Sequence, residues 1–194
     1  MIFYKNPVIL SIFSGVLLTL SWPVQGLSFL IFFSLIPLFF VENQITKGNS
    51  KRKKLRWFAL SYLGFFIWNL GTTWWIVNSS VFGMTFAILC NTSFYAILMM
   101  LFHWSKKRLP LRTAYIFLIS LWIAFEKFHL MWDFSWPWLN LGNVFSEEIQ
   151  WIQWYEFTGS FGGTLWVLLI NIGLFEVFKN NPPSFKNTLW VKKM

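Results

Sequence analysis

Two ionisable residues at the end of an apolar segment have the types and spacing that could support chemistry. Glu126 is followed three residues later by His129, and the segment before them is largely apolar. A carboxylate inside a membrane is costly and indicates a functional site. The Glu-x-x-His spacing matches half of a di-metal carboxylate site, but the sequence has no second copy, so no metal is predicted. Because Lys127 is adjacent, a structural hydrogen bond or ion pair is the alternative to catalysis.

Tryptophans close to prolines and small polar residues form a second group of candidates. These residues are Trp74, Trp75, Trp136, Pro137, Trp138, Asn140 and Gly142. Indole rings concentrate where a membrane meets water, so an aromatic belt is one interpretation. The other is that these residues, with Glu126, wall a groove for a lipid acyl chain.

The remaining polar residues in apolar segments favour structural roles. Cys90 stands alone, so it cannot form a disulfide within the chain, and it is predicted to pack in the interior. His103 precedes Lys106 and Lys107 and is predicted to be an exposed helix end. Four asparagines are predicted to bond between helices, namely Asn69, Asn78, Asn91 and Asn171. Serine-hydrolase, zinc-protease, P-loop and Rossmann signatures are all missing, so no cofactor is predicted.

The composition identifies the class of protein that must position these residues. Of the 194 residues, 56% are hydrophobic and 22% aromatic, only 12% are charged, and the mean hydropathy is +0.54. A soluble domain has about 25% charged residues. The chain therefore has too few polar residues to cover a water-facing surface, which predicts an all-α polytopic membrane protein.

Six apolar segments can be assigned as transmembrane helices, because a hydrocarbon core about 30 Å thick needs roughly 20 residues per helix. The predicted helices cover about residues 7–21, 27–41, 55–77, 81–104, 114–128 and 161–178. The apolar spacing between Glu147 and Phe157 predicts a short helix lying in the membrane surface. Residues 179–194 are predicted to form a cytoplasmic tail.

The charged residues orient these helices. Sixteen Lys and Arg oppose seven Asp and Glu, a net charge of +9, and the basic residues gather in 42–56, 103–112 and 179–194. Cationic short loops stay in the cytoplasm, which places both termini there. The segment of about 129–160 on the other side holds four of the seven acids and no Lys or Arg. Since topology explains the basic surplus, nucleic acid is not a predicted partner.

The order of several motifs resembles a known family. They are Leu20-Ser21-Trp22-Pro23, Gly64-Phe65-Phe66, Thr73-Trp74-Trp75, Leu121 to Glu126, Phe134 to Gly142, and Phe157 to Gly163. Together they resemble the N-terminal membrane region of apolipoprotein N-acyltransferase, in a form like that of Bacteroidetes members. The resemblance covers about residues 7–178, and its most specific part is the Trp-Glu helix followed by the Pro-Trp-Leu loop.

The resemblance implies a location and an activity. Members of this family lie in the bacterial inner membrane and move an acyl chain from a phospholipid to the N-terminal diacylglyceryl-cysteine of a lipoprotein. A Cys nucleophile, a Glu base and a Lys that stabilises the oxyanion perform the transfer through a thioester. All three belong to a nitrilase-like domain that follows the membrane helices, and the resemblance implies that the candidate residues above face either this domain or the lipid groove.

Nothing after Phe178 resembles that domain, and Cys90 and Glu126 lie within predicted membrane helices. The 194 residues are therefore expected to be inactive by themselves and to depend on a nitrilase-like catalytic part, encoded downstream or as a separate chain. The alternative is a stand-alone membrane scaffold or lipid-binding subunit.

Overall fold

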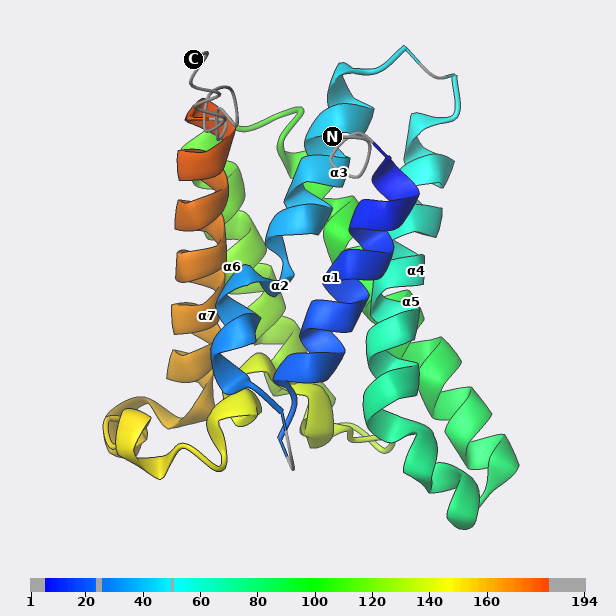
Figure 1. Ribbon diagram of the computed structural model, residues 1–194, viewed down its shortest axis with the longest axis vertical. Coiled ribbons are helices and arrows are strands. Elements are labelled where there is room, and N and C mark those ends of the chain that lie inside the picture. The colour runs from blue at the N-terminus through cyan, green and yellow to red at the C-terminus, as the bar shows by residue number, and fades with distance from the viewer. Residues whose placement is uncertain (1–5, 24–25, 50, 182–194) are drawn as a thin grey trace, which may run out of the picture.

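The computed structural model describes residues 6–23, 26–49 and 51–181, and in those ranges the chain forms helices and loops but no strand. The α-helices are α1 (Pro7–Ser21), α2 (Ile31–Ser34), α3 (Ile36–Lys47), α4 (Lys53–Thr73), α5 (Val81–Ser105), α6 (Leu111–His129) and α7 (Tyr155–Asn180) (Figure 1). The same ranges also contain five 3-10 helices: η2 (Ser28–Leu30), η3 (Trp74–Asn78), η4 (Pro137–Leu139), η5 (Leu141–Phe145) and η6 (Ile149–Trp151). The predicted all-α class is confirmed for the described residues.

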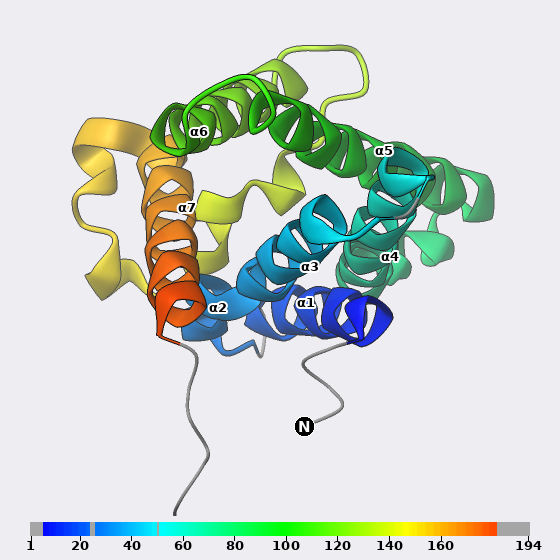
Figure 2. The same ribbon diagram turned by 90° about the horizontal axis from the view of Figure 1, so that it is seen from above.

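The helices close a ring around a common core. Contacts run from α1 to α4, then to α5, α6 and α7, and α2 and α3 join α7 back to α1. Figure 2, which views the bundle from above, shows this order around the ring. The core is rich in large aromatic side chains, and Trp57, Trp68 and Trp122 are fully buried within it.

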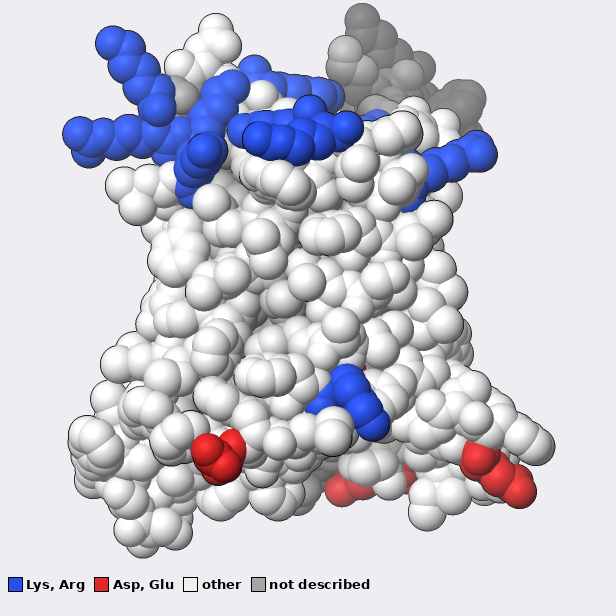
Figure 3. Space-filling view, turned by 180° about the vertical axis from the view of Figure 1, so that it is seen from behind, with Lys and Arg blue, Asp and Glu red and all other residues white. Residues whose placement is uncertain are grey.

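The two ends of the bundle differ in charge. The α3–α4 and α5–α6 connections and the end of α7 lie at one end (Figure 1), where Lys and Arg gather on the face shown in Figure 3. We call this the basic end. The other end contains η3 and residues 130–154, including Asp133, Glu147 and Glu148. We call it the acidic end.

Among the described residues, three helical segments are long and apolar enough to cross a membrane: Ser28–Lys47, Val81–Ser105 and Tyr155–Asn180. The α1 helix is apolar but has only 15 residues. The structure thus supports a membrane protein, and the six predicted spans remain a prediction.

The predicted helix over 27–41 is interrupted. It is divided into η2, α2 and α3, and α3 continues to Lys47. Pro37 lies in the first turn of α3, where proline is tolerated because that turn has no intrahelical partner for its N–H groups. The backbone groups freed at the break are bonded by Asn171 of α7, whose Nδ2 donates to the Ile31 carbonyl at 2.8 Å and whose Oδ1 accepts from the Leu35 N–H at 2.8 Å. The interhelical role predicted for this asparagine is therefore confirmed.

Replacing Asn171 by leucine should destabilise the bundle by about 2 kcal/mol, because the buried Leu35 N–H loses its acceptor while the side-chain volume is nearly conserved. Thermal unfolding in detergent micelles measures the change. Asn69→Leu is the matched control, because the Asn69 amide donates to the Phe65 carbonyl of its own helix. Equal losses in the two variants would contradict the bridging role of Asn171.

The connection between α6 and α7 also differs from the prediction. In place of one surface helix from Glu147 to Phe157, it contains the three-residue η6 and then a short helical stretch from Tyr155, which the kink at Gly159 separates from the rest of α7. Gly159, at φ 62° and ψ −169°, kinks α7 near its start. A positive φ is strained for residues with a Cβ, so a glycine here lets the chain turn from the loop into the bundle. Of the predicted tail 179–194, residues 182–194 lie outside the described ranges.

Candidate functional site

A cleft of about 970 Å³ opens at the acidic end of the bundle. Its walls come from the end of α1, the α4–η3 junction and the 3-10 segment after α6. The lining includes Leu20, Trp22, Thr73, Trp74, Trp75, Pro137, Trp138 and Leu139. Small-molecule sites typically have volumes of about 300–1,000 Å³ and mostly apolar walls. Size and lining therefore suit an apolar ligand.

Two exposed tryptophans meet across this cleft. The rings of Trp75 and Trp138 lie edge to face with centroids 6.1 Å apart, and Trp74, beside them, is also exposed. The Trp75 indole N–H donates to the Thr72 carbonyl at 3.1 Å, which orients this ring relative to α4. The cleft thus presents aromatic faces to an occupant rather than charged groups.

Glu126 is fully buried and contacts the segment of residues 136–145 that follows α6, which we call the η4–η5 segment. Its Oε1 accepts from the Leu141 backbone N–H at 2.8 Å and from the Trp122 indole at 3.2 Å. Its Oε2 accepts from the Thr164 hydroxyl at 2.6 Å. One carboxyl therefore ties α6, the start of η5 and α7 together.

Gly142 extends this connection to α7. Its N–H donates to the Thr164 hydroxyl at 3.0 Å, and its carbonyl accepts from Tyr155 at 2.8 Å. A Cβ at Gly142 would overlap the Ser160 carbonyl, so only glycine allows this close approach. Next to it, Asn140 is buried, and its carbonyl accepts from the Asn143 N–H at 2.9 Å.

The eight candidates therefore separate into three groups. Trp74, Trp75, Pro137 and Trp138 line the cleft. Glu126, Asn140 and Gly142 are buried and hold the segment that carries one of its walls. Trp136 instead lines a smaller pocket between α5 and the segment after α6.

The Glu-x-x-His pair does not converge on one point. Glu126 contacts Leu141 and Thr164, whereas His129 is packed among the rings of Phe94 and Trp132. Among the described residues, no group of three or more His, Cys, Asp or Glu could hold a metal ion.

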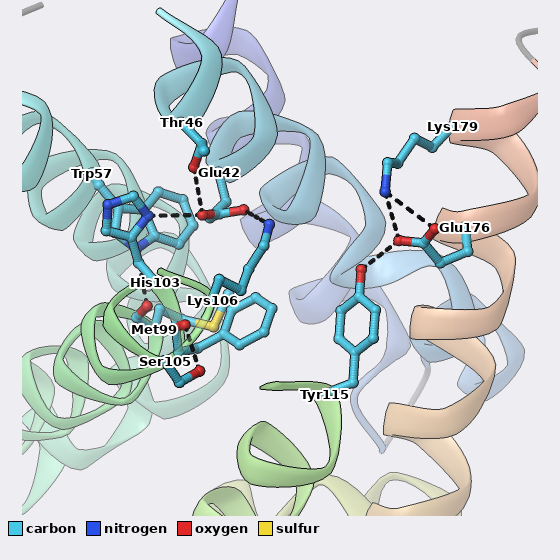
Figure 4. A network of polar contacts seen from close by, with 11 residues as sticks. Glu42, Thr46, Trp57, Met99, His103, Ser105, Lys106, Tyr115, Glu176 and Lys179 are labelled. Atoms are coloured by element: carbon cyan, nitrogen blue, oxygen red, sulfur yellow. Dashed lines mark hydrogen bonds and ion pairs between the residues drawn. The ribbon is translucent and has the colours of Figure 1, made fainter. Parts of the chain in front are cut away.

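The structure contains a buried polar network at the basic end that was not predicted from the sequence (Figure 4). Glu42 is 1% exposed and accepts from His103 Nδ1 at 2.7 Å, from Thr46 at 2.8 Å and from Lys106. The expectation that His103 is exposed was wrong, because this histidine is 2% exposed and bonded to α3. The sequence does contain a signal, since Glu42 is the one acid in the first 125 residues.

A second polar contact lies beside this network and joins α6 to α7. Glu176 accepts from the Tyr115 hydroxyl at 2.5 Å and pairs with Lys179 at 2.9 Å (Figure 4). Glu42 and Glu176 are therefore each paired with a lysine at the basic end.

The sequence of this chain is similar to that of one known protein family. The model of the apolipoprotein N-acyltransferase N-terminal domain matches residues 14–173. The apolipoprotein N-acyltransferase of Chlorobaculum tepidum is 27% identical over 178 residues, which cover 90% of this chain and 32% of that protein. The apolipoprotein N-acyltransferase of Geobacter metallireducens is 26% identical over 184 residues, which cover 90% of this chain and 34% of that protein. The chain thus spans about a third of the length of these curated relatives. No solved structure matches it.

Proposed function

This chain belongs to the apolipoprotein N-acyltransferase N-terminal domain family, and from that membership we propose that it forms the membrane part of such an enzyme. The enzyme would transfer an acyl chain from a phospholipid to the N-terminal diacylglyceryl-cysteine of a lipoprotein. The geometric observation that carries this proposal is the aromatic cleft at the acidic end. Its volume and its exposed rings suit an acyl chain that must leave the bilayer to react.

The acidic end has a defined part in this proposal. The cleft residues Trp75 and Trp138 contact the lipid chain, and the segment from Trp136 to Asn143 faces the catalytic domain. Glu126 acts as a positioning residue, because its hydrogen bonds hold that segment against α6 and α7. No reacting group is assigned to the described residues.

The acyl-transfer chemistry is proposed to come from a nitrilase-like part outside these 194 residues, as a continuation of the chain or as a separate chain. The one thiol of this chain belongs to Cys90, which lies on α5 and lines a different pocket from the aromatic cleft. We therefore expect the 194-residue polypeptide, reconstituted with phospholipid and a diacylglyceryl lipopeptide, to form no N-acylated product. Product formed by this polypeptide alone would overturn the assignment.

The proposed orientation places the basic end in the cytoplasm and the acidic end outside the bacterial inner membrane, with α1, η2–α3, α4, α5, α6 and α7 as the six spans. The charge asymmetry supports it, because Lys and Arg are retained on the cytoplasmic side. A reporter that is active only in the cytoplasm should give a signal when it is fused after Gly48 or Leu109. A reporter that is active only outside the cytoplasm should give a signal when it is fused after Ser146. A cytoplasmic signal from the Ser146 fusion would contradict this topology.

A further inference from the structure

The α3–α4 connection concentrates positive charge at the basic end of the bundle (Figure 1). No Asp or Glu occurs in the sequence between Glu42 and Glu126, so this charge is not balanced within its own segment. Six of the ten residues from 47 to 56 are basic, and we call them the α3–α4 basic cluster: Lys47, Lys51, Arg52, Lys53, Lys54 and Arg56.

The nearest acid in the sequence does not neutralise this cluster. Glu42 is buried and paired with His103 and Lys106. Lys51 and Lys54 are exposed and belong to no ion pair within the part of the chain that the structure describes. The first turn of α4 contains no acid and no capping side chain, so the positive end of the helix dipole adds to the charge of the lysines. The cluster therefore favours an anion that comes from outside the bundle.

A row of aromatic rings runs along α4 from this cluster. Phe58, Tyr62 and Phe66 follow Lys54 at intervals of four residues, so the four side chains share one face of the helix. The ring centroids are 5.9 Å apart between Phe58 and Tyr62 and 6.3 Å apart between Tyr62 and Phe66. The three rings are only partly buried, and none of them packs against the hydrophobic core. This α4 aromatic row therefore lies on the outer surface of the bundle, where a membrane protein meets lipid.

The juxtaposition of the two features indicates the chemistry of an occupant. Exposed cations at a membrane surface attract anionic head groups, and an apolar row beneath them suits an attached acyl chain. A soluble anion would use the first feature and leave the second without a partner. The complementary ligand is therefore an anion with a long apolar chain, which is an anionic phospholipid.

We propose that Lys51, Lys54 and the α4 aromatic row bind one anionic phospholipid, with the lysines on its phosphate and the rings along its acyl chain. This site lies at the opposite end of the bundle from the aromatic cleft, so its lipid is not the one that occupies the cleft. Under the orientation proposed above, it comes from the cytoplasmic leaflet. The binding itself depends neither on that orientation nor on acyl transfer.

Two lipids with the same chains test the selectivity of this site in the wild-type chain. The full chain is purified in maltoside micelles, and native mass spectrometry measures the Kd of dioleoylphosphatidylglycerol and of dioleoylphosphatidylcholine. We expect one tightly bound phosphatidylglycerol, with a Kd at least about tenfold lower than that of phosphatidylcholine, because only the first lipid has a net negative charge. Equal Kd values for the two lipids would overturn the proposal.

A pair of double variants locates the charge that matters. Lys51→Gln, Lys54→Gln should raise the Kd of phosphatidylglycerol about thirtyfold, the factor that corresponds to about 1 kcal/mol for each lysine. Lys107→Gln, Arg112→Gln removes the same charge from exposed positions in and after the α5–α6 connection, and it should change the Kd less than about threefold. If the two double variants act alike, the lipid responds to total charge and the proposed site does not exist.

The aromatic row has a separate signature. Phe58→Ala, Tyr62→Ala should weaken both lipids by the same factor, because their acyl chains are identical, and should leave the ratio of the two Kd values unchanged. Phe82→Ala, at a ring that is 81% exposed near the start of α5, is the matched control and should change neither Kd. Wild-type binding by the Phe58→Ala, Tyr62→Ala variant would exclude the row from the site and contradict the proposal.

Competition in the wild-type chain tests the source of the phosphate without any dependence on the folding of a variant. At physiological ionic strength, equimolar glycerol phosphate, which lacks acyl chains, should not displace phosphatidylglycerol, and neither should a DNA oligonucleotide. Displacement by glycerol phosphate would assign the cluster to a soluble anion, and displacement by the oligonucleotide would assign it to nucleic acid. Either result would overturn the proposal. Because the readout is lipid binding, its failure would leave the proposed acyltransferase role standing.

Discussion

Replacement of Glu126 by alanine is expected to lower the free energy of unfolding by about 3 kcal/mol, the largest effect at the acidic end, because several buried donors lose their acceptor at once. The Leu141 N–H, the Trp122 indole and the Thr164 hydroxyl all donate to this carboxyl. The loss should be local first, since the start of η5 is released from α6 and α7. Thermal unfolding in micelles and limited proteolysis between η4 and η6 measure the two parts of the effect.

The conservative variant separates geometry from charge. In Glu126→Gln, the amide oxygen can still accept from Leu141, and the amide nitrogen can donate to the Thr164 hydroxyl, so most of the stability should remain. Glu156→Ala, an exposed acid at the start of α7, is the control for removal of a carboxyl from the acidic end. If Glu126→Ala leaves both stability and proteolysis unchanged, Glu126 does not position the η4–η5 segment.

Replacement of Glu42 by alanine should cost about 3–5 kcal/mol, the range for breaking a buried ion pair by removing one partner. The variant leaves His103 and Lys106 without the carboxylate that they contact at the basic end. The change is measured by unfolding the protein with heat or with increasing concentrations of a denaturing detergent, while circular dichroism monitors the helix content.

Two comparisons identify the cause of that loss. Removing both charges, in a Glu42→Leu, Lys106→Leu double variant, should recover much of the stability, because an apolar pair of similar volume avoids the unpaired charge. Lys179→Ala, which breaks the partly exposed pair with Glu176 and leaves the Tyr115 hydrogen bond in place, should cost only about 1 kcal/mol or less. A double variant as unstable as Glu42→Ala would contradict the ion-pair explanation.

The membrane character and helical class could be predicted from the sequence because both depend on composition and local hydropathy. The break between α2 and α3 could not be predicted from the local sequence. Pro37 marks a possible helix start, but the interruption is stable only because Asn171, which is 136 residues away from Leu35, bonds the freed backbone. A contact over that separation has no local signal.

The candidate site shows the same division. The tryptophans of the cleft could be selected because their position near segment ends is typical of an interface. The structural role of Glu126 was one of the predicted alternatives, but its contacts with Leu141 and Thr164 depend on the path of the η4–η5 segment. Glu42 was missed since it falls one residue beyond the predicted helix, in a segment dominated by basic residues.

A chimera tests the central claim most directly. The part of the Chlorobaculum tepidum relative that this chain matches is replaced by the 194 residues of this chain, and N-acylation of a diacylglyceryl lipopeptide is measured in proteoliposomes. The chimera should form product, Trp138→Ala should lower kcat/KM by about tenfold through loss of an aromatic lipid contact, and Trp104→Ala at the basic end should leave it unchanged. A folded, membrane-inserted chimera that forms no product, or one in which Trp138→Ala and Trp104→Ala act alike, would contradict the assignment of this chain as the lipid-binding membrane part of an acyltransferase.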